Sequence, residues 1–121
     1  SIKNIKLPVS APFHCNLMNK ATNIMNDELN KLNFNEGENK LISNVTAKEI
    51  SNSTELKELL VKQIENRVRW RESVINMINN GVNHFIEIGP GKVLSGLVKR
   101  INKEVKIDTI NNQGEIESLK I

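Results

Sequence analysis

The sequence predicts an α/β domain with a mainly parallel sheet and flanking helices. Segments with the two-residue period of strands alternate along the chain with segments of helical period. The 121 residues, 38% of them hydrophobic, are enough to bury one core. No internal repeat or low-complexity linker divides the sequence. Strands that alternate with helices are typical of α/β layers.

The first third of the chain predicts a strand, a turn and a helix. Residues 5–9 alternate between apolar and polar side chains, as a half-buried strand does. A helix is expected over residues 17–33, because apolar side chains recur there at helical spacing: Leu17, Ala21, Ile24, Met25, Leu29 and Leu32.

The middle of the chain predicts a short strand and two helices. Residues 41–45 read as a strand after the loop around Gly37. The cluster Ser51-Asn52-Ser53 is a capping signal for a helix over residues 53–66. A further helix is expected over residues 68–80, where Asn80-Gly81 would end it as a C-cap does.

The last third predicts a strand, a tight turn, a helix and a second strand. The strands are expected at residues 82–88 and 105–110, and the helix between them at residues 93–102. Gly89-Pro90-Gly91 supplies the turn that joins the first strand to this helix. A short helix is expected to close the chain.

Composition narrows the function classes. No apolar run approaches the 18–20 residues of a membrane span, and the first residues lack the pattern of a signal peptide. Aromatic residues make up only 3% of the chain and the net charge is +3, so nucleic acid is a weak hypothesis, whereas an acidic protein partner fits. A single cysteine suits a reducing compartment and leaves no zinc cluster. We expect a cytoplasmic protein with no metal site, no membrane partner and no nucleic-acid partner.

Sites in α/β sheets gather where strands end and helices begin. In the first turn of a helix, His14 would lie in the positive field of the helix N-terminus, which favours a neutral imidazole that can act as a general base. Taken alone, a lone histidine is more often structural, and His84 has the same interpretation. Gly89-Pro90-Gly91-Lys92 is compatible with a phosphate-binding loop, but it lacks the spacing of a P-loop, and a structural turn is favoured.

Four blocks of the sequence lie in order along essentially the whole chain: Leu7-Pro8-Val9-Ser10-Ala11-Pro12-Phe13-His14-Cys15, Ser43-Asn44-Val45, Gln63 with Val68-Arg69-Trp70, and Glu87-Ile88-Gly89-Pro90-Gly91-Lys92-Val93-Leu94-Ser95-Gly96-Leu97. In order and spacing they resemble the C-terminal portion of the malonyl-CoA:acyl carrier protein transacylases. This resemblance reverses the preference for a structural His14.

The resemblance implies an α/β-hydrolase-like core with a small ferredoxin-like subdomain inserted in it. Residues 1–121 would be the C-terminal segment of that acyltransferase domain, without the insertion and without the upstream nucleophile elbow. The elbow sequence Gly-His-Ser-Leu-Gly does not occur in these residues. We therefore expect this segment to be inactive alone, and its absent initial Met to mean that it is a piece of a longer enzyme.

The reaction that the resemblance implies is transfer of a malonyl group from malonyl-CoA to a serine, and then to the phosphopantetheine thiol of acyl carrier protein. His14 would be the general acid and base. Gln63 matches the residue whose main-chain carbonyl orients that histidine, and Phe13 and Asn44 would lie at the substrate pocket. No cofactor is expected, since malonyl-CoA is a substrate and the phosphopantetheine belongs to the carrier protein. The partners would be acyl carrier protein and the rest of the enzyme.

In related acyltransferase domains, a Phe directly before the histidine goes with malonyl groups and a Ser with methylmalonyl groups. The ring of Phe13 would clash with an α-methyl branch. Two other classes of function stay open. One is a noncatalytic module that binds acyl carrier protein, and the other is a small phosphate-binding α/β domain built around Gly89-Pro90-Gly91-Lys92.

Overall fold

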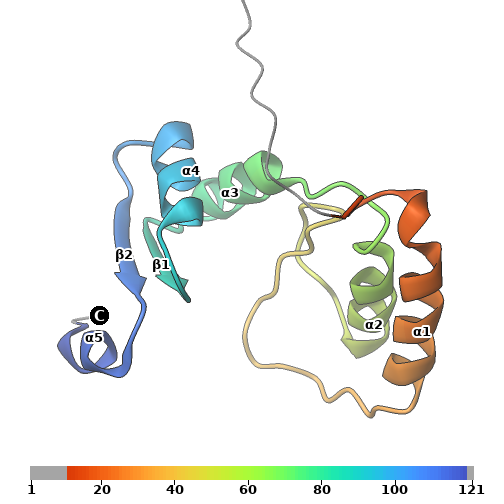
Figure 1. The fold of residues 1–121 in the computed structure, drawn as a ribbon. Coiled ribbons are helices and arrows are strands. Elements are labelled where there is room, and N and C mark those ends of the chain that lie inside the picture. Colours follow the sequence, from red (N-terminus) through yellow and green to blue (C-terminus); the bar gives the residue numbers. More distant parts are fainter. Residues whose placement is uncertain (1–10, 120–121) are drawn as a thin grey trace, which may run out of the picture. The chain divides into compact units, whose positions relative to one another are not determined.

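The computed structural model describes residues 11–119, so the strand expected at residues 5–9 lies outside the described residues. The chain forms two compact units, one that ends at Arg69 and one that begins at Trp70. Figure 1 gives the order of their elements, and the α/β class predicted from the sequence is confirmed.

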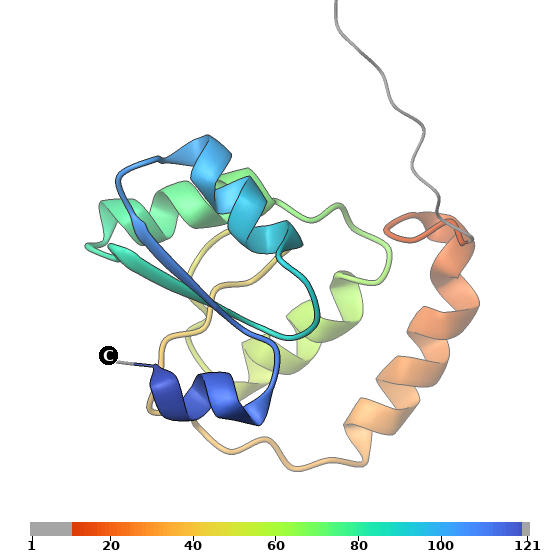
Figure 2. The ribbon, with the colours of Figure 1, turned by 60° about the vertical axis from the view of Figure 1, so that its left-hand side comes forward.

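The first unit consists of two helices and a long connecting loop. The 3-10 turn η1 (Asn16–Met18) leads into α1 (Asn19–Asn30), and α2 (Ser53–Lys62) follows the loop. The two α-helices pack side by side, as Figures 1 and 2 both show. The capping prediction for α2 is confirmed, because Asn52 Oδ1 accepts the Glu55 N–H at 2.9 Å. The helix ends at Lys62, four residues earlier than expected.

The strand expected at residues 41–45 is wrong. Only an isolated antiparallel bridge joins Ile42 to Glu49 there. The side-chain oxygen of Ser43 accepts the main-chain N–H of Val45 at 3.1 Å and of Thr46 at 3.4 Å, which turns the chain back on itself. A serine that bonds its own local backbone in this way competes with a strand ladder, and the apolar pattern of the segment does not reveal it.

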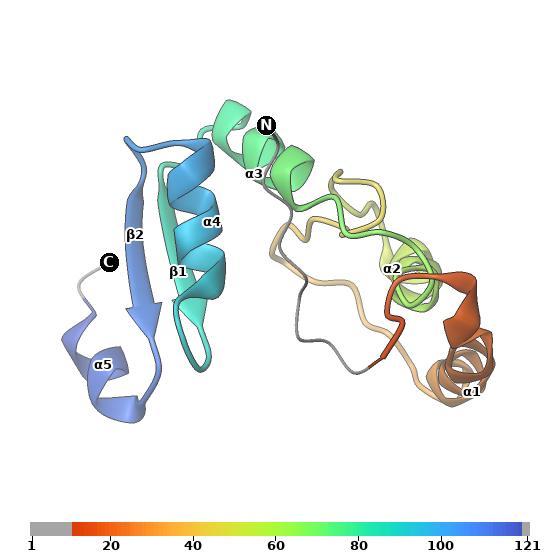
Figure 3. The same cartoon turned by 45° about the horizontal axis from the view of Figure 1, so that its top comes forward.

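The second unit is a β–α–β arrangement with two further helices. Its elements are α3 (Trp70–Asn79), β1 (His84–Ile88), α4 (Val93–Ile101), β2 (Lys106–Ile110) and α5 (Gln113–Ser118). The strands β1 and β2 pair in parallel, with His84 opposite Lys106 and Ile88 opposite Ile110. Figure 3 shows α4 alongside both strands. The expected helix end at Asn80-Gly81 is confirmed: Gly81 has φ of 93°, and the Val82 N–H returns to Met77 O at 3.0 Å.

The core of the second unit lies between α3, α4 and one face of the sheet. Val74, Val98 and Val105 are buried at its centre, with exposed fractions of 5% or less. Six half-buried side chains surround them: Trp70, Met77, Ile78, Phe85, Ile101 and Ile107. Because side chains alternate across a strand, Phe85 and Ile107 turn toward this core while their neighbours in sequence turn to the other face.

Candidate functional site

His14 lies in the turn before the first helix and not, as expected, in a helical first turn. Its backbone is left-handed, with φ of 61°, and the 3-10 turn begins only at Asn16. Its main-chain N–H donates to Ile64 O at 3.1 Å, just beyond α2. The turn therefore directs His14 toward the C-terminal end of α2 and not, as the sequence suggests, into the first turn of a helix.

Within the described part of the chain, the imidazole of His14 contacts the main chain of Gln63. Its Nδ1 lies 2.8 Å from the main-chain oxygen of Gln63. A carbonyl oxygen only accepts hydrogen bonds, so this contact requires a proton on Nδ1. In the neutral ring the lone pair is then on Nε2, which is the nitrogen that can take up a proton from a substrate or a nucleophile.

The end of α2 explains why the Gln63 carbonyl is available. The last four carbonyls of an α-helix have no partner within the helix, and Gln63 is the C-cap residue directly after α2. Its own N–H still donates to Leu59 O at 3.0 Å, which fixes the plane of the preceding peptide. A helix C-terminus thus supplies the acceptor for which many hydrolases use a carboxylate.

Asn44 lies next to this pair, on the turn that Ser43 forms. Its Nδ2 donates to Gln63 Oε1 at 3.1 Å, and its main-chain oxygen accepts the Arg69 N–H at 2.8 Å. Asn44 and Gln63 also line a cavity of about 240 Å³ whose other walls are largely apolar, Leu56 and Leu59 among them. The structure therefore brings His14, Gln63 and Asn44 together in one unit.

Phe13 presents its side chain to the surface of the first unit, with 59% of the residue exposed. Its main-chain N–H donates to Ala11 O at 3.0 Å, which closes the tight turn just before His14. An exposed ring on the residue that precedes His14 is compatible with a pocket wall, and that role remains a prediction.

Several main-chain N–H groups at the turn of residues 89–92 and at the start of α4 already have partners within the chain. Glu87 Oε1 accepts the Leu94 N–H at 3.1 Å and Oε2 the Ser95 N–H at 2.7 Å, so an internal carboxylate already occupies the start of α4. The Gly91 N–H donates to Asn111 Oδ1 at 2.8 Å. These contacts favour the structural interpretation of the turn.

Sequence reasoning missed both anchors of this turn. The role of Glu87 has a signal in the sequence. It is an acidic residue two positions before a Gly-Pro-Gly turn that leads into a helix, and from there it can reach the first N–H groups of that helix. Asn111 follows directly after β2 and has no comparable signal, because only the parallel pairing of the strands brings it beside Gly91.

The second histidine, His84, has a structural partner. Its Nε2 lies 2.7 Å from Asp108 Oδ2 on the neighbouring strand, and Lys106 Nζ lies 3.2 Å from the same oxygen. The His84 ring and the Lys106 ammonium hold the pKa of the Asp108 carboxyl below its ordinary value. Within residues 11–119, no three His, Cys, Asp or Glu side chains gather as metal ligands would.

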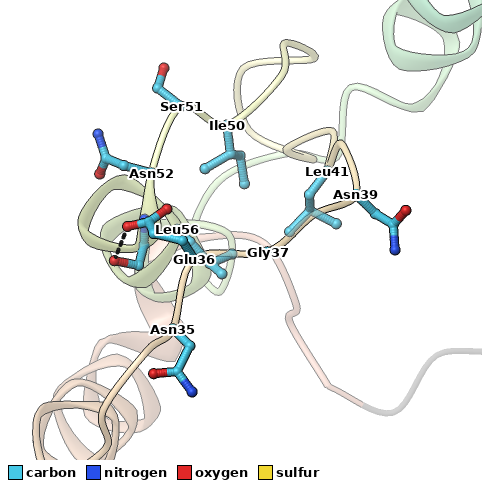
Figure 4. A pocket seen from close by; sticks show the side chains of 10 residues that line it. Asn35, Glu36, Gly37, Asn39, Leu41, Ile50, Ser51, Asn52 and Leu56 are labelled. Atoms are coloured by element: carbon cyan, nitrogen blue, oxygen red, sulfur yellow. Dashed lines mark hydrogen bonds between the residues drawn. The ribbon is translucent and has the colours of Figure 1, made fainter.

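Another cavity, of about 150 Å³, lies at the opposite end of α2 (Figure 4). Glu36 lies in it but is engaged as a cap, since its Oε1 accepts from the Ser53 hydroxyl at 2.7 Å and from the Ser53 N–H at 3.2 Å. The Ser53 hydroxyl and N–H lower the pKa of Glu36, so it is an ionised structural group. No histidine is among the residues that line this cavity.

The comparisons with known proteins agree on one group of enzymes. No protein-family model matches the chain. The malonyl CoA-acyl carrier protein transacylase of Bacillus subtilis is 41% identical over 113 residues, 93% of this chain and 36% of that protein. The transacylase of the same name from Escherichia coli K12 is 41% identical over 107 residues, 88% of this chain and 35% of that protein.

Solved structures lead to the same group. The acyl-carrier-protein-S-malonyltransferase of Bartonella henselae superimposes with a TM-score of 0.85 at 46% identity, over 93% of this chain and 36% of that one. The malonyl CoA-acyl carrier protein transacylase of Clostridium perfringens superimposes with a TM-score of 0.86 at 42% identity, over 94% of this chain and 36% of that one. The chain is homologous to part of the malonyl-CoA:acyl carrier protein transacylases. It spans about a third of the length of these transacylases, and the resemblance drawn from the sequence is confirmed.

Two further observations bear on partners. One of the similar structures is a complex of a type II PKS acyl-carrier protein with its malonyl-transacylase. The match has 34% identity and a TM-score of 0.84, and it covers 93% of this chain and 36% of that one. Of the helices formed by residues 11–119, none has the length and apolar character needed to cross a membrane.

Proposed function

We propose that this chain supplies the general acid and base of a malonyl-CoA:acyl carrier protein transacylase, and that His14 is that residue. The observation that carries the proposal is the 2.8 Å contact between His14 Nδ1 and Gln63 O, which leaves Nε2 as the proton acceptor. The homology to transacylases supports the same reaction class. In this proposal the remaining two thirds of the enzyme supply the nucleophilic serine.

The first half-reaction moves the malonyl group onto that serine. The serine hydroxyl gives its proton to His14 Nε2 while its oxygen attacks the thioester carbonyl of malonyl-CoA. The C–S bond of the tetrahedral intermediate then breaks, and the departing sulfur of CoA takes the proton from Nε2. The products are an acyl-serine ester and free CoA.

The second half-reaction runs the same steps in reverse with another thiol. The phosphopantetheine thiol of acyl carrier protein gives its proton to His14 Nε2 and attacks the acyl-serine ester. The serine oxygen leaves and takes the proton back, which restores the starting enzyme. No cofactor enters either step.

Gln63 would orient the imidazole through an uncharged carbonyl. A neutral acceptor stabilises the imidazolium less than a carboxylate does. This weaker stabilisation of the imidazolium suits the exchange of an acyl group between thiols, because a thiol leaves more readily than an amine and depends less on protonation.

Acyl carrier protein and malonyl-CoA are the proposed partners, and the cytoplasm is the proposed location. The complex formed by the related malonyl-transacylase supports the first partner, and the net charge of +3 suits an acidic protein. A noncatalytic module that only binds carrier protein is the competing candidate. It has the same homology in its favour but gives the His14–Gln63 contact no role.

The test uses the complete transacylase chain that contains these residues, with radiolabelled malonyl-CoA and acyl carrier protein. His14→Ala should lower malonyl transfer by at least about 10²-fold, the range of general acid–base catalysis. The matched control is His84→Ala, the same change at the other histidine of the chain, which should keep most of the transfer. Near-full activity of His14→Ala, with carrier-protein binding intact, would favour the binding module.

A further inference from the structure

Asn44 is linked to His14 through two different atoms of Gln63. The Asn44 amide donates to the side-chain oxygen of Gln63 at 3.1 Å, and the main-chain oxygen of Gln63 accepts from the His14 ring at 2.8 Å. We infer that Asn44 is a positioning residue, which holds Gln63 and through it fixes the orientation and the tautomer of the His14 imidazole. This inference rests on the function proposed for His14.

The support for Asn44 is itself firm. Ser43, which precedes it, is 5% exposed, and its main-chain N–H and carbonyl bond to Lys48 O and Ala47 N, both at 2.9 Å. On the other side, the carbonyl of Asn44 accepts the Arg69 N–H at 2.8 Å. The backbone of Asn44 is therefore held from both sides, which fixes the point of the main chain from which its side chain reaches Gln63.

Gln63 lies where the backbone of a helix is least restrained. It is the C-cap of α2, and the residues after it form short-range turns, such as the one closed by the Ile64 N–H to Val61 O bond at 3.2 Å. Helix ends fray, because their last carbonyls lack the ladder that fixes the interior. The hydrogen bond from Asn44 to the side chain of Gln63 limits that motion, as the outer contacts of a catalytic group do in general.

Positioning and substrate contact have different kinetic signatures. A residue that touches malonyl-CoA in the ground state mainly changes KM, whereas one that orients the base mainly changes kcat. The structure favours the second role, because the Asn44 amide donates to Gln63 Oε1 at 3.1 Å.

The test is a double-mutant cycle in the complete transacylase. Asn44→Ala and Gln63→Ala remove the same contact from opposite sides, and Gln63→Ala keeps the main-chain carbonyl that His14 uses. Each should lower kcat about 3- to 10-fold, which is the rate equivalent of one neutral hydrogen bond, with KM unchanged. The double variant should be no slower than either single one, because both act through one contact. If one variant fails to fold, the other still tests the contact.

Asn23→Ala is the matched control. Asn23 is exposed in the same unit, and its Nδ2 makes a comparable amide-to-amide contact with Asn19 Oδ1 at 3.3 Å. It should leave kcat unchanged. A raised KM with constant kcat in Asn44→Ala would mean that Asn44 touches substrate, and additive losses in the double variant would mean that the two residues act separately. Either result overturns the inference.

A second readout does not depend on activity. The ¹⁵N shifts of the His14 ring, measured at a pH above about 8.5 where a histidine is neutral, report which nitrogen carries the proton. The wild type should have it on Nδ1, and Asn44→Ala should populate the other tautomer while Asn23→Ala does not. If His14→Ala abolishes transfer but Asn44→Ala changes neither kcat nor tautomer, the inference fails and the proposed function stands. If His14→Ala keeps transfer, the proposed function fails on its own test.

Discussion

The carboxylate of Glu87, next to last in β1, accepts the main-chain N–H of Ser95 at 2.7 Å across the turn that leads into α4. The same carboxylate accepts the Leu94 N–H at 3.1 Å. Glu87 reaches α4 because it lies on the same face of the strand as Phe85, which packs into the core that α4 covers. A residue of the strand thus caps the helix that follows it.

We predict that Glu87→Gln destabilises the second unit at neutral pH and that the effect disappears in acid. The Ser95 hydroxyl beside the carboxylate, the Ser95 N–H and, more weakly, the Leu94 N–H hold the pKa of Glu87 below its ordinary value. A lowered folded-state pKa means that the stabilisation is complete above the unfolded value, about 4.3, and is lost as the pH falls through the folded value. Thermal melts of the wild type and of Glu87→Gln, at pH 7 and at about pH 3, measure the destabilisation and its loss in acid.

Glu117→Gln is the control for this prediction, because Glu117 is an exposed glutamate on α5. It should shift the melting temperature less than Glu87→Gln at pH 7. An equal shift in the two variants would show that the loss of one negative charge matters and the capping geometry does not.

A second pH-dependent prediction concerns Asp108. The His84 ring and the Lys106 ammonium lower its pKa, so its contribution to stability is present above the unfolded value of about 3.9 and lost as the pH falls through the lower folded value. Asp108→Asn should therefore melt earlier than the wild type at pH 6 and converge with it near pH 2–3. A difference that stays constant over this range would assign the effect to packing.

Val74 should be the side chain on which the second unit depends most. It is fully buried, with 0% exposure, between α3 and the rest of the core. Val74→Ala removes two buried methyl groups and leaves a cavity, which should cost about 2 kcal/mol of unfolding free energy and lower Tm by roughly 5–15 °C. Val93→Ala deletes the same atoms from a residue that is 72% exposed, and should change the unfolding free energy by less than about 0.5 kcal/mol.

The sequence predicted the second unit better than the first. Periodicity alone gave the order β1, α4 and β2, because each segment is short, bounded by turn residues and buried on one face. The same reasoning fails in the loop between α1 and α2. The apolar residues at 41–45 have the pattern of a strand, but the Ser43 side chain accepts the Val45 and Thr46 N–H groups and forms a turn.

The site was predictable in its members and not in its geometry. His14, Gln63 and Asn44 came from the family resemblance, and they lie together. Their distances in sequence carry no signal of this, because the His14 turn and the end of α2 meet only through packing of α1 on α2. The place predicted for His14, in the first turn of a helix, is wrong. The left-handed backbone at His14 directs it to the C-terminal end of α2 instead.

The last prediction concerns the acyl group that the proposed enzyme accepts. The Phe13 ring is 59% exposed directly before His14, so it is available to line the space where the acyl group meets the base. Phe13→Ser in the complete transacylase should raise kcat/KM for methylmalonyl-CoA relative to malonyl-CoA by about 10- to 200-fold, because a hydrophobic pocket discriminates one methyl group by about 1–3 kcal/mol. Phe34→Ser is the matched control: its ring lies 5.5 Å from Lys57 Nζ, so it should not change the ratio. A ratio that moves equally in both variants would remove Phe13 from the pocket, while an altered ratio in Phe13→Ser alone would assign the α-carbon of the substrate to this side of the imidazole.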